Sequence, residues 1–389
     1  MYKYCFLIVL CMSSVFCFSQ EELSYVTPTD KMADVLINYS LELQPHERIA
    51  IFTQSEANEL NIALYREALL AGAYPVIICE IPSSNEIFYT YANKDQLAYE
   101  EDYFLYIINN FDVLLNIGAT SNTKSLNNVN PELFQITANA NKKVTERFME
   151  RDGNNELRWC YATYPTDALA QEAEMGTVEY KEFVFNSCKL NTPDPAQSWE
   201  EDSKRQRELS AWLKGKDKIE LKGPEIDLSL SIKDRAFLVA DGKLNFPDGE
   251  IYCSPIENSA NGWVKFSYPA IVMGKEIRDL ELWFKNGKVV KCKASKGEEL
   301  FSEMLKTDKG ANVLGELGIG TNYSIKRFTK NMLYDEKIGG TIHLAVGNGF
   351  PDSGGKNVSS VHTDMVCNMK SSEIIVDGEL FYKDGEFLK

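Results

Sequence analysis

The chain has 389 residues, of which 44% are hydrophobic and 25% are charged. These proportions are close to the average for soluble globular proteins, and they exclude a disordered chain, a collagen-like repeat and a polytopic membrane protein. Lysine and arginine total 41 against 57 aspartates and glutamates, so the formal net charge is −16. Because an acidic chain repels phosphate, we expect no nucleic-acid partner and no anionic membrane surface. Metal ions and substrates with a free amine suit this charge better.

The first twenty residues differ from the rest of the chain. Lys3 gives a basic start, residues 5–18 are almost wholly apolar, and two glutamates follow residue 20. This pattern predicts a signal peptide over residues 1–20 and an exported protein, either periplasmic or secreted. The apolar stretch of about 14 residues is short for a membrane span, which needs about 20, so no stable span is expected after signal removal. An uncleaved anchor and lipidation at Cys17 stay open as alternatives, although the bulky Phe16 disfavours the second.

The nine cysteines include three in the predicted signal, and none of the other six forms a CxxC pair. A thiolate zinc site or a thioredoxin motif is therefore unsupported. Several of the six lie in apolar runs, as at residues 76–79, which favours buried small hydrophobic side chains. One or two disulfides remain an alternative in an exported protein.

Residues 30–190 alternate between helical and strand patterns. Helices are expected over 29–41, 57–73 and 95–111, and apolar strands over 48–53, 74–81, 112–118 and 157–164. Apolar strands separated by helices predict a parallel sheet covered on both faces. The first domain, residues 21–205, is therefore predicted to be a Rossmann-like α/β domain.

The pattern becomes β-rich after a charged helical stretch at residues 194–215. We expect a helix over 298–314 and strands over 226–232, 249–255, 262–268, 277–284 and 289–294. The pairs at 286–287, 377–378 and 384–385, one Asn-Gly and two Asp-Gly, are typical of tight hairpin turns. The second domain, residues 206–389, is therefore predicted to be a β-rich α+β domain. The fold class as a whole is α/β.

The chain has only three histidines, His46, His343 and His362. His362 and Asp364 are two residues apart in a strand-like segment, so both side chains point to one face, as a metal site requires. An ordinary strand pair with one hydrogen bond explains this spacing as well. His343 has apolar neighbours on both sides, and a buried histidine needs either a hydrogen-bond partner or a metal. His46 is assigned no role.

Two glutamates complete the candidate site. Glu316 is expected where a helix ends, at the unfavourable end of the helix dipole, and a nearby cation would offset that. Glu250 follows a turn and starts a strand. Taken singly, each is typical of a solvated surface glutamate. Together with the two histidines and Asp364, they supply five ligands for two divalent ions, a composition that lowers the pKa of a bound water toward neutrality.

The same segments carry a resemblance to a known family. They read FPDGEIYCSPIENSANG, KGANVLGELGIGTN, GTIHLAVGNGFP and SSVHTDMVCNM, with YPTDALAQEAEMGTVEYKEFVFNSC upstream. Residues 32–387 resemble the dinuclear metalloaminopeptidases of the aminopeptidase T/aminopeptidase S family. The resemblance implies a homodimer that removes N-terminal residues from peptides with a free N-terminus. It also implies two divalent ions, zinc or cobalt with magnesium or manganese as alternatives, held by Glu250, Glu316, His343, His362 and Asp364.

The expected reaction is hydrolysis of the first peptide bond by a metal-activated water. Glu316 is the candidate bridging carboxylate. Glu257 is the candidate general acid for the leaving amine, although surface capping explains it as well.

Two features depart from the family pattern. Phe350 stands where the family carries a tyrosine, and the loss of one such hydroxyl donor costs about 2.7–4 kcal/mol of transition-state stabilisation. The segment 347–360 is also shorter than in the best-known members, which leaves the preferred substrate size open. Two alternatives to an active exported aminopeptidase therefore remain. One is a catalytically weakened metal- or peptide-binding relative, and the other is a dinuclear amidohydrolase acting on non-peptide substrates.

Overall fold

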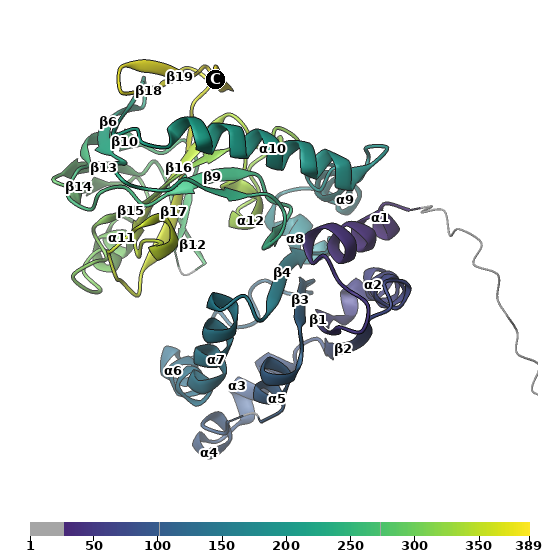
Figure 1. Cartoon of the computed structure of the whole chain (residues 1–389). Helices are drawn as coiled ribbons and strands as arrows, with labels where there is room; N and C mark the ends of the chain where they lie inside the picture. The colour runs from purple at the N-terminus through teal and green to yellow at the C-terminus, as the bar shows by residue number, and fades with distance from the viewer. Residues whose placement is uncertain (1–26, 101, 273) are drawn as a thin grey trace, which may run out of the picture.

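The computed structural model describes residues 27–100, 102–272 and 274–389. They form two lobes, an α/β lobe from the first half of the chain and a β-rich lobe from the second (Figure 1). The predicted signal peptide, residues 1–20, lies outside the described residues. Within the described ranges, no helix combines the length and the apolar character that a membrane crossing requires.

The α/β lobe is built on a parallel sheet with the strand order β2-β1-β3-β4-β8. Its strands are β1 (Arg48–Gln54), β2 (Tyr74–Glu80), β3 (Val113–Gly118), β4 (Arg158–Thr163) and β8 (Asn245–Phe246). The first four confirm the predicted apolar strands, and all pairings in this sheet are parallel. The fifth comes from the second half of the chain, so the sheet is completed by residues that the sequence assigned to the other domain.

Helices cover both faces of this sheet, as the apolar runs predict. One face packs against α1 (Pro28–Asp34), the π-helical turn Val35–Ser40, α2 (Asn58–Leu70), α8 (Asp167–Glu172) and α9 (Thr177–Ser187). The other packs against α5 (Asp102–Asn110) and α7 (Lys142–Gly153). Three further helices lie in the same lobe: α3 (Ser84–Tyr91), α4 (Lys94–Leu97) and α6 (Pro131–Ala140). The single helix predicted over 95–111 is thus two helices, α4 and α5.

The β-rich lobe contains two larger sheets that enclose a common core. The first has the order β14-β13-β10-β6-β5-β18-β19-β20, formed by β5 (Lys218–Gly223), β6 (Ile226–Ser231), β10 (Asn261–Lys265), β13 (Glu281–Lys285), β14 (Lys288–Lys293), β18 (Glu373–Val376), β19 (Glu379–Lys383) and β20 (Glu386–Phe387). The second has the order β17-β16-β15-β9-β7, formed by β7 (Leu238–Ala240), β9 (Glu250–Cys253), β15 (Leu314–Gly320), β16 (Thr341–Gly347) and β17 (His362–Asn368). A small hairpin joins β11 (Ala270–Val272) to β12 (Lys275–Ile277).

The predicted hairpin turns are confirmed. Asn286-Gly287 joins β13 to β14, and both residues have positive φ, 51° and 78°. The two Asp-Gly pairs likewise join β18 to β19 and β19 to β20. Positive φ at both central residues matches the twist of the flanking strands, and Asn-Gly and Asp-Gly tolerate it best.

The predicted helix over 298–314 is wrong in its second half. Helix α11 (Glu298–Met304) ends early, and Glu316 lies in the middle of β15 rather than at a helix end. Every residue of this strand is buried, although three of its seven residues are glycines. Glycine is depleted in strands except where another group must approach the backbone closely. The helix-dipole argument for Glu316 therefore does not apply.

The long helix α10 (Pro195–Leu213) confirms the predicted helical stretch between the lobes, and the predicted domain boundary after residue 205 falls inside it. The short helix α12 (Met332–Asp335) belongs to the β-rich half of the chain, but Tyr334 packs in the core of the α/β lobe. None of the six cysteines beyond the predicted signal is disulfide-bonded. Four of them are buried, as their apolar surroundings predict. The prediction is wrong for Cys79, which is exposed because β2 is the edge strand of its sheet.

Candidate metal centre

The second sheet of the β-rich lobe has one apolar face and one polar face. Because side chains alternate along a strand, residues two apart share a face. Its apolar face enters the core through Ile251, Cys253, Leu317, Ile319, Ile342, Leu344, Met365 and Cys367. The alternate positions on β9, β15, β16 and β17 are the predicted ligands Glu250, Glu316, His343, His362 and Asp364. The fold therefore brings all five together on one surface.

Small residues lie opposite the large polar ones on this face. Gly318 pairs with His343, and Gly347 pairs with His362. A Cβ atom at position 318 would lie 2.0 Å from Cε1 of His343, so only glycine leaves room for the imidazole. Gly318 is thus explained by the histidine on the neighbouring strand. A Cβ at Gly315 or Gly320 would instead meet backbone carbonyls, those of Gly347 and Asn348 or that of Ile338.

The potential ligand atoms fall into three groups, and within each they all lie within 4.8 Å of one another. The groups are Glu250, Glu316 and His343; Glu316, His362 and Asp364; and Glu336, His343 and Asp364. Glu316 belongs to two groups because its two oxygens diverge. Oε1 is 3.3 Å from Nε2 of His343, and Oε2 is 3.2 Å from Nε2 of His362. This is the geometry of a bridging carboxylate.

Each histidine is oriented by a backbone carbonyl. Nδ1 of His343 lies 3.1 Å from the carbonyl oxygen of Glu336, and Nδ1 of His362 lies 3.0 Å from that of Asn348. A proton on Nδ1 that is donated to a carbonyl leaves the Nε2 lone pair for a metal. Both Nε2 atoms face the carboxylates, as metal coordination requires.

The donor set fits divalent cations. Four carboxylates, Glu250, Glu316, Glu336 and Asp364, crowd the two histidines. Oε2 of Glu250 lies 3.0 Å from Nε2 of His343, and Oδ1 of Asp364 lies 3.5 Å from Nε2 of His362. Burial alone would lower the pKa of His362, but Asp364 and Glu316 raise it to about 11. Such an excess of negative charge around imidazole Nε2 atoms is what a metal ion neutralises when it displaces their protons.

The cluster contains two further charged residues, Glu336 and Lys337, that were not predicted from the sequence. Burial raises the pKa of Glu336 to about 8, while Lys337 acts in the opposite direction. The Lys337 side chain is fully buried, with Nζ 3.1 Å from Oε1 of Glu250 and 3.7 Å from Oδ1 of Asp248. It also forms an ion pair with Glu336. Adjacent acidic and basic residues after a short helix are typical of a solvated turn, so no sequence signal marks them.

Glu257 is in none of the three groups. Both of its oxygens accept from Nη2 of Arg235, at 2.9 and 2.8 Å, and Oε1 also accepts from the backbone N–H of Lys356 at 2.7 Å. Burial would raise its pKa, but the backbone N–H groups and Arg235 together lower it. A carboxyl held ionised in this way is a poor proton donor, and its contacts instead fix the segment between β16 and β17.

Phe350 lies beside the metal cluster. Its ring meets that of His362 edge-on at 5.3 Å between centroids, and meets that of Tyr252 edge-on at 5.0 Å. Its backbone N–H donates to Oγ of Ser254 at 2.7 Å, which fixes its position. Tyr252 shares the polar face with Glu250 and lies opposite Gly318. Among the described residues, nothing forms a hydrogen bond with the Tyr252 hydroxyl. His46 belongs to the α/β lobe, where its Nδ1 lies 3.1 Å from the hydroxyl of Tyr74.

Curated relatives are aminopeptidases. Aminopeptidase PepS of Streptococcus thermophilus is 23% identical over 90% of this chain and 93% of its own length. Aminopeptidase 2 of Geobacillus stearothermophilus is 24% identical over 92% and 94%. Aminopeptidase T of Thermus thermophilus is 26% identical over 68% and 72%.

Solved structures show the same fold. Wild-type AmpT from Thermus thermophilus superposes with a TM-score of 0.81 at 21% identity, covering 93% of this chain and 99% of that one. A 2,5-dihydroxypyridine dioxygenase from Pseudomonas putida superposes with a TM-score of 0.60 at 12% identity, covering 93% and 98%. The fold therefore hosts different chemistries, and the family assignment rests on sequence. The family described as thermophilic metalloprotease (M29) matches residues 27–387. The chain thus belongs to the thermophilic metalloprotease family and is a peptide hydrolase.

Proposed function

We propose that this protein is an exported, two-metal aminopeptidase that removes residues from the free N-terminus of peptides. The observation that carries this proposal is the position of Glu316, which presents one oxygen to each histidine. The names of the curated relatives support the peptide substrate and the N-terminal cleavage.

Glu250, Glu316 and His343 would hold one cation, and Glu316, His362 and Asp364 would hold the other. Two cations there would activate water and polarise the scissile carbonyl. Imidazole and carboxylate donors suit zinc or cobalt, with magnesium or manganese as alternatives. Glu336 is a further candidate ligand, because its carboxylate groups with His343 and Asp364.

The pocket in front of the cluster supports the expected preference for a free amine. It has a volume of about 440 Å³ and includes His362 and Asp364. Glu172 and Glu276 also line it, but Lys124 and Lys330 of the same lining pair with them at 2.7 and 3.0 Å. The carboxylates of the metal cluster are therefore the groups that would attract the cationic N-terminus of a peptide. A substrate whose amine is acetylated loses this attraction.

Tyr252 is the candidate for the hydroxyl donor that Phe350 cannot supply. Hydrolysis of an amide needs a donor to the developing oxyanion, and Phe350 has none. Within the described residues the Tyr252 hydroxyl has no hydrogen-bond partner, and its ring packs edge-on against that of Phe350. We assign the oxyanion donor to Tyr252, which favours an active enzyme over a weakened binding relative.

The assay that tests the proposed function uses residues 21–389, stripped of metal and then given zinc, cobalt or nothing. Release of p-nitroaniline from leucine-p-nitroanilide only when metal is present, and none from the N-acetylated substrate, would support the aminopeptidase. Equal cleavage of both substrates would favour the non-peptide amidohydrolase. Two bound metals with no cleavage would favour the weakened relative.

Export and dimerisation are also part of the proposal. The charge and hydropathy pattern of residues 1–20 supports export, and the family resemblance supports a homodimer. Expression of the full chain in a bacterial host should yield a mature protein that starts near Glu21, identified by N-terminal sequencing. Light scattering on a sizing column should give twice the mass of the chain. A cytoplasmic, full-length product would contradict export.

Gly318→Ala should remove one metal and most of the activity. The added methyl would overlap the imidazole of His343, which is fully buried and has no space to retreat. We expect metal content, measured by elemental analysis, to fall from two ions to one or fewer per chain. Gly153→Ala is the matched control, because nothing lies within 4 Å of the added Cβ at the end of α7. Full metal loading of Gly318→Ala would contradict the close contact.

A further inference from the structure

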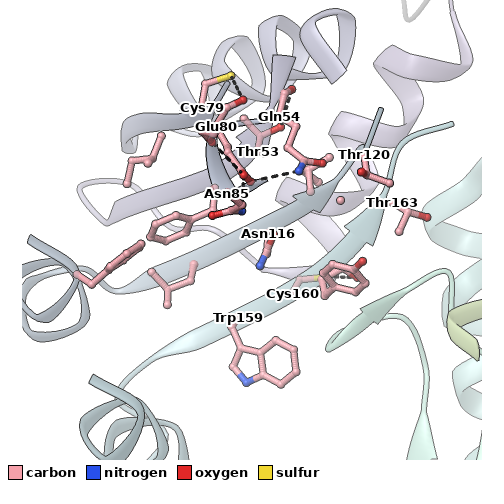
Figure 2. Close-up of a pocket in the computed structure, with 18 of the residues that line it drawn as sticks. Thr53, Gln54, Cys79, Glu80, Asn85, Asn116, Thr120, Trp159, Cys160 and Thr163 are labelled. Atoms are coloured by element: carbon pink, nitrogen blue, oxygen red, sulfur yellow. Dashed lines mark hydrogen bonds between the residues drawn. The ribbon is translucent and has the colours of Figure 1, made fainter. Parts of the chain in front are cut away.

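The α/β lobe contains a cavity of about 1020 Å³ at the carboxyl ends of its strands. Figure 2 shows it over β1 to β4, with Asn116 near the centre of the view. The strand order β2-β1-β3-β4 places β1 and β3 side by side where the winding of the sheet reverses. In open parallel sheets, ligands bind outside the carboxyl ends of the strands at this reversal.

The cavity extends beyond the part of this sheet face that α5 and α7 cover. At the amino ends of the strands, Leu114 and Trp159 pack with Ile108 of α5 and Phe148 of α7, and these side chains form the apolar end of the cavity. Toward the carboxyl ends, the same face carries Gln54, Glu80, Asn116 and Tyr161, all of which line the cavity. The change from apolar to polar side chains along one face marks where the core ends and an accessible surface begins.

Two of these polar groups lack partners. Gln54 and Glu80 are engaged, because Oε1 of Gln54 accepts from the N–H of Ala119 at 2.8 Å and its Nε2 donates to Glu80 at 3.2 Å. In contrast, the Asn116 amide and the Tyr161 hydroxyl make no hydrogen bond with any described residue. The hydroxyl lies over Gly118, where a Cβ would come within 2.7 Å of it. An amide and a phenol left free in a concave site suit an uncharged hydrogen-bonding ligand.

The lining also limits the chemistry of the ligand. Of the described residues around the cavity, none is a lysine or an arginine, which disfavours phosphate and carboxylate groups. Aromatic side chains are frequent instead, namely Phe52, Tyr103, Phe104, Phe148, Trp159 and Tyr161. Aromatic walls with a few neutral polar groups suit peptide amides that carry apolar or aromatic side chains.

The cavity adjoins the pocket of the metal centre. Leu169 and Asn331 line both spaces, and the second space also contains His362 and Asp364. We infer that this cavity is the subsite for the part of the peptide beyond the cleaved bond, and that it takes uncharged, apolar or aromatic residues from the second position onward. The inference rests on the proposed aminopeptidase function for the direction in which the peptide lies.

Kinetics with substrates of two lengths test the subsite. Leucine-p-nitroanilide ends close to the cleaved bond, whereas a C-terminally amidated tetrapeptide of leucine, phenylalanine, alanine and phenylalanine, in that order, extends into the cavity. For Asn116→Leu and Tyr161→Phe, we expect KM for the tetrapeptide to rise about five-fold, the value of one lost hydrogen bond. Both kinetic constants for leucine-p-nitroanilide should stay unchanged. Tyr65→Phe, at an exposed position on α2, is the matched control.

A binding measurement separates this inference from the proposed function. With metal-stripped protein, the tetrapeptide should change the fluorescence of Trp159, and Trp159→Phe should remove that change. Asn116→Leu should weaken the apparent Kd about five-fold. If no substrate is cleaved, the proposed function fails, but the titration still decides on the subsite. Equal KM changes for both substrates, or no Trp159 response to the tetrapeptide, would overturn the subsite.

Discussion

Glu316→Gln is expected to lose both bound cations together and to lower kcat/KM by about 10²–10³-fold. Each oxygen of this carboxylate faces a different histidine, and the side chain is almost fully buried in β15. Glutamine has the same shape, but its NH₂ group cannot bind a cation and it carries no charge. Elemental analysis after dialysis gives the metal content, and leucine-p-nitroanilide gives the rate.

Glu303→Gln is the matched control for this change. Glu303 is an exposed glutamate on α11 whose single ion pair is with Lys306 at 2.7 Å. It should keep two metals and full activity. Loss of only one cation from Glu316→Gln would show that the carboxylate does not bridge. Retention of both, with normal activity, would contradict the whole assignment of the site.

Tyr252→Phe is expected to lower kcat about 10²-fold and to leave KM within about two-fold, because an oxyanion donor acts mainly in the transition state. Metal content should stay at two per chain, since no ligand is changed. The double variant Tyr252→Phe/Phe350→Tyr should recover most of the lost rate. The two rings touch at 5.0 Å between centroids, so the exchange moves one hydroxyl across that contact.

Tyr91→Phe serves as the control, because Tyr91 is 80% exposed on α3. Full activity of Tyr252→Phe would show that the Tyr252 hydroxyl is not the oxyanion donor. A low rate in both the single and the double variant, with metals retained, would assign Tyr252 to packing instead. A gain of activity in Phe350→Tyr alone would show that Tyr252 only partly replaces the missing hydroxyl.

Much of the architecture could be predicted from local patterns. The apolar runs of β1 and β3 predict buried parallel strands because no face of such a strand meets water. Asn286-Gly287 predicts its hairpin because few other pairs accept positive φ at both positions. The alternation in β17 places His362 and Asp364 on one face. These signals are contained in short segments, so a single sequence reveals them.

The remaining features depend on contacts between distant segments. Glycines make β15 hard to recognise as a strand, and each is required by a group from a distant segment, such as the His343 imidazole beside Gly318. Glu336 and Lys337 are charged residues in a turn, and only the tertiary structure buries them among carboxylates. Strand β8 is two residues long, and its place in the parallel sheet depends on β4. Propensity and periodicity cannot detect such relations.

Strand β8 also connects the two lobes. Phe246, at the end of β8, is hydrogen-bonded into the sheet of the α/β lobe beside Ala162, and Glu250, four positions later, begins β9 in the metal sheet. Only three residues separate the two strands, so the position of Glu250 depends on both lobes. The Glu250 carboxylate lies 3.0 Å from His343, and any relative movement of the lobes would reach it through this short segment. Tyr161, which lines the large cavity, pairs with β8 as well. A ligand in the cavity would therefore contact β4, the strand that holds β8 and, through it, the segment that leads to the metal centre.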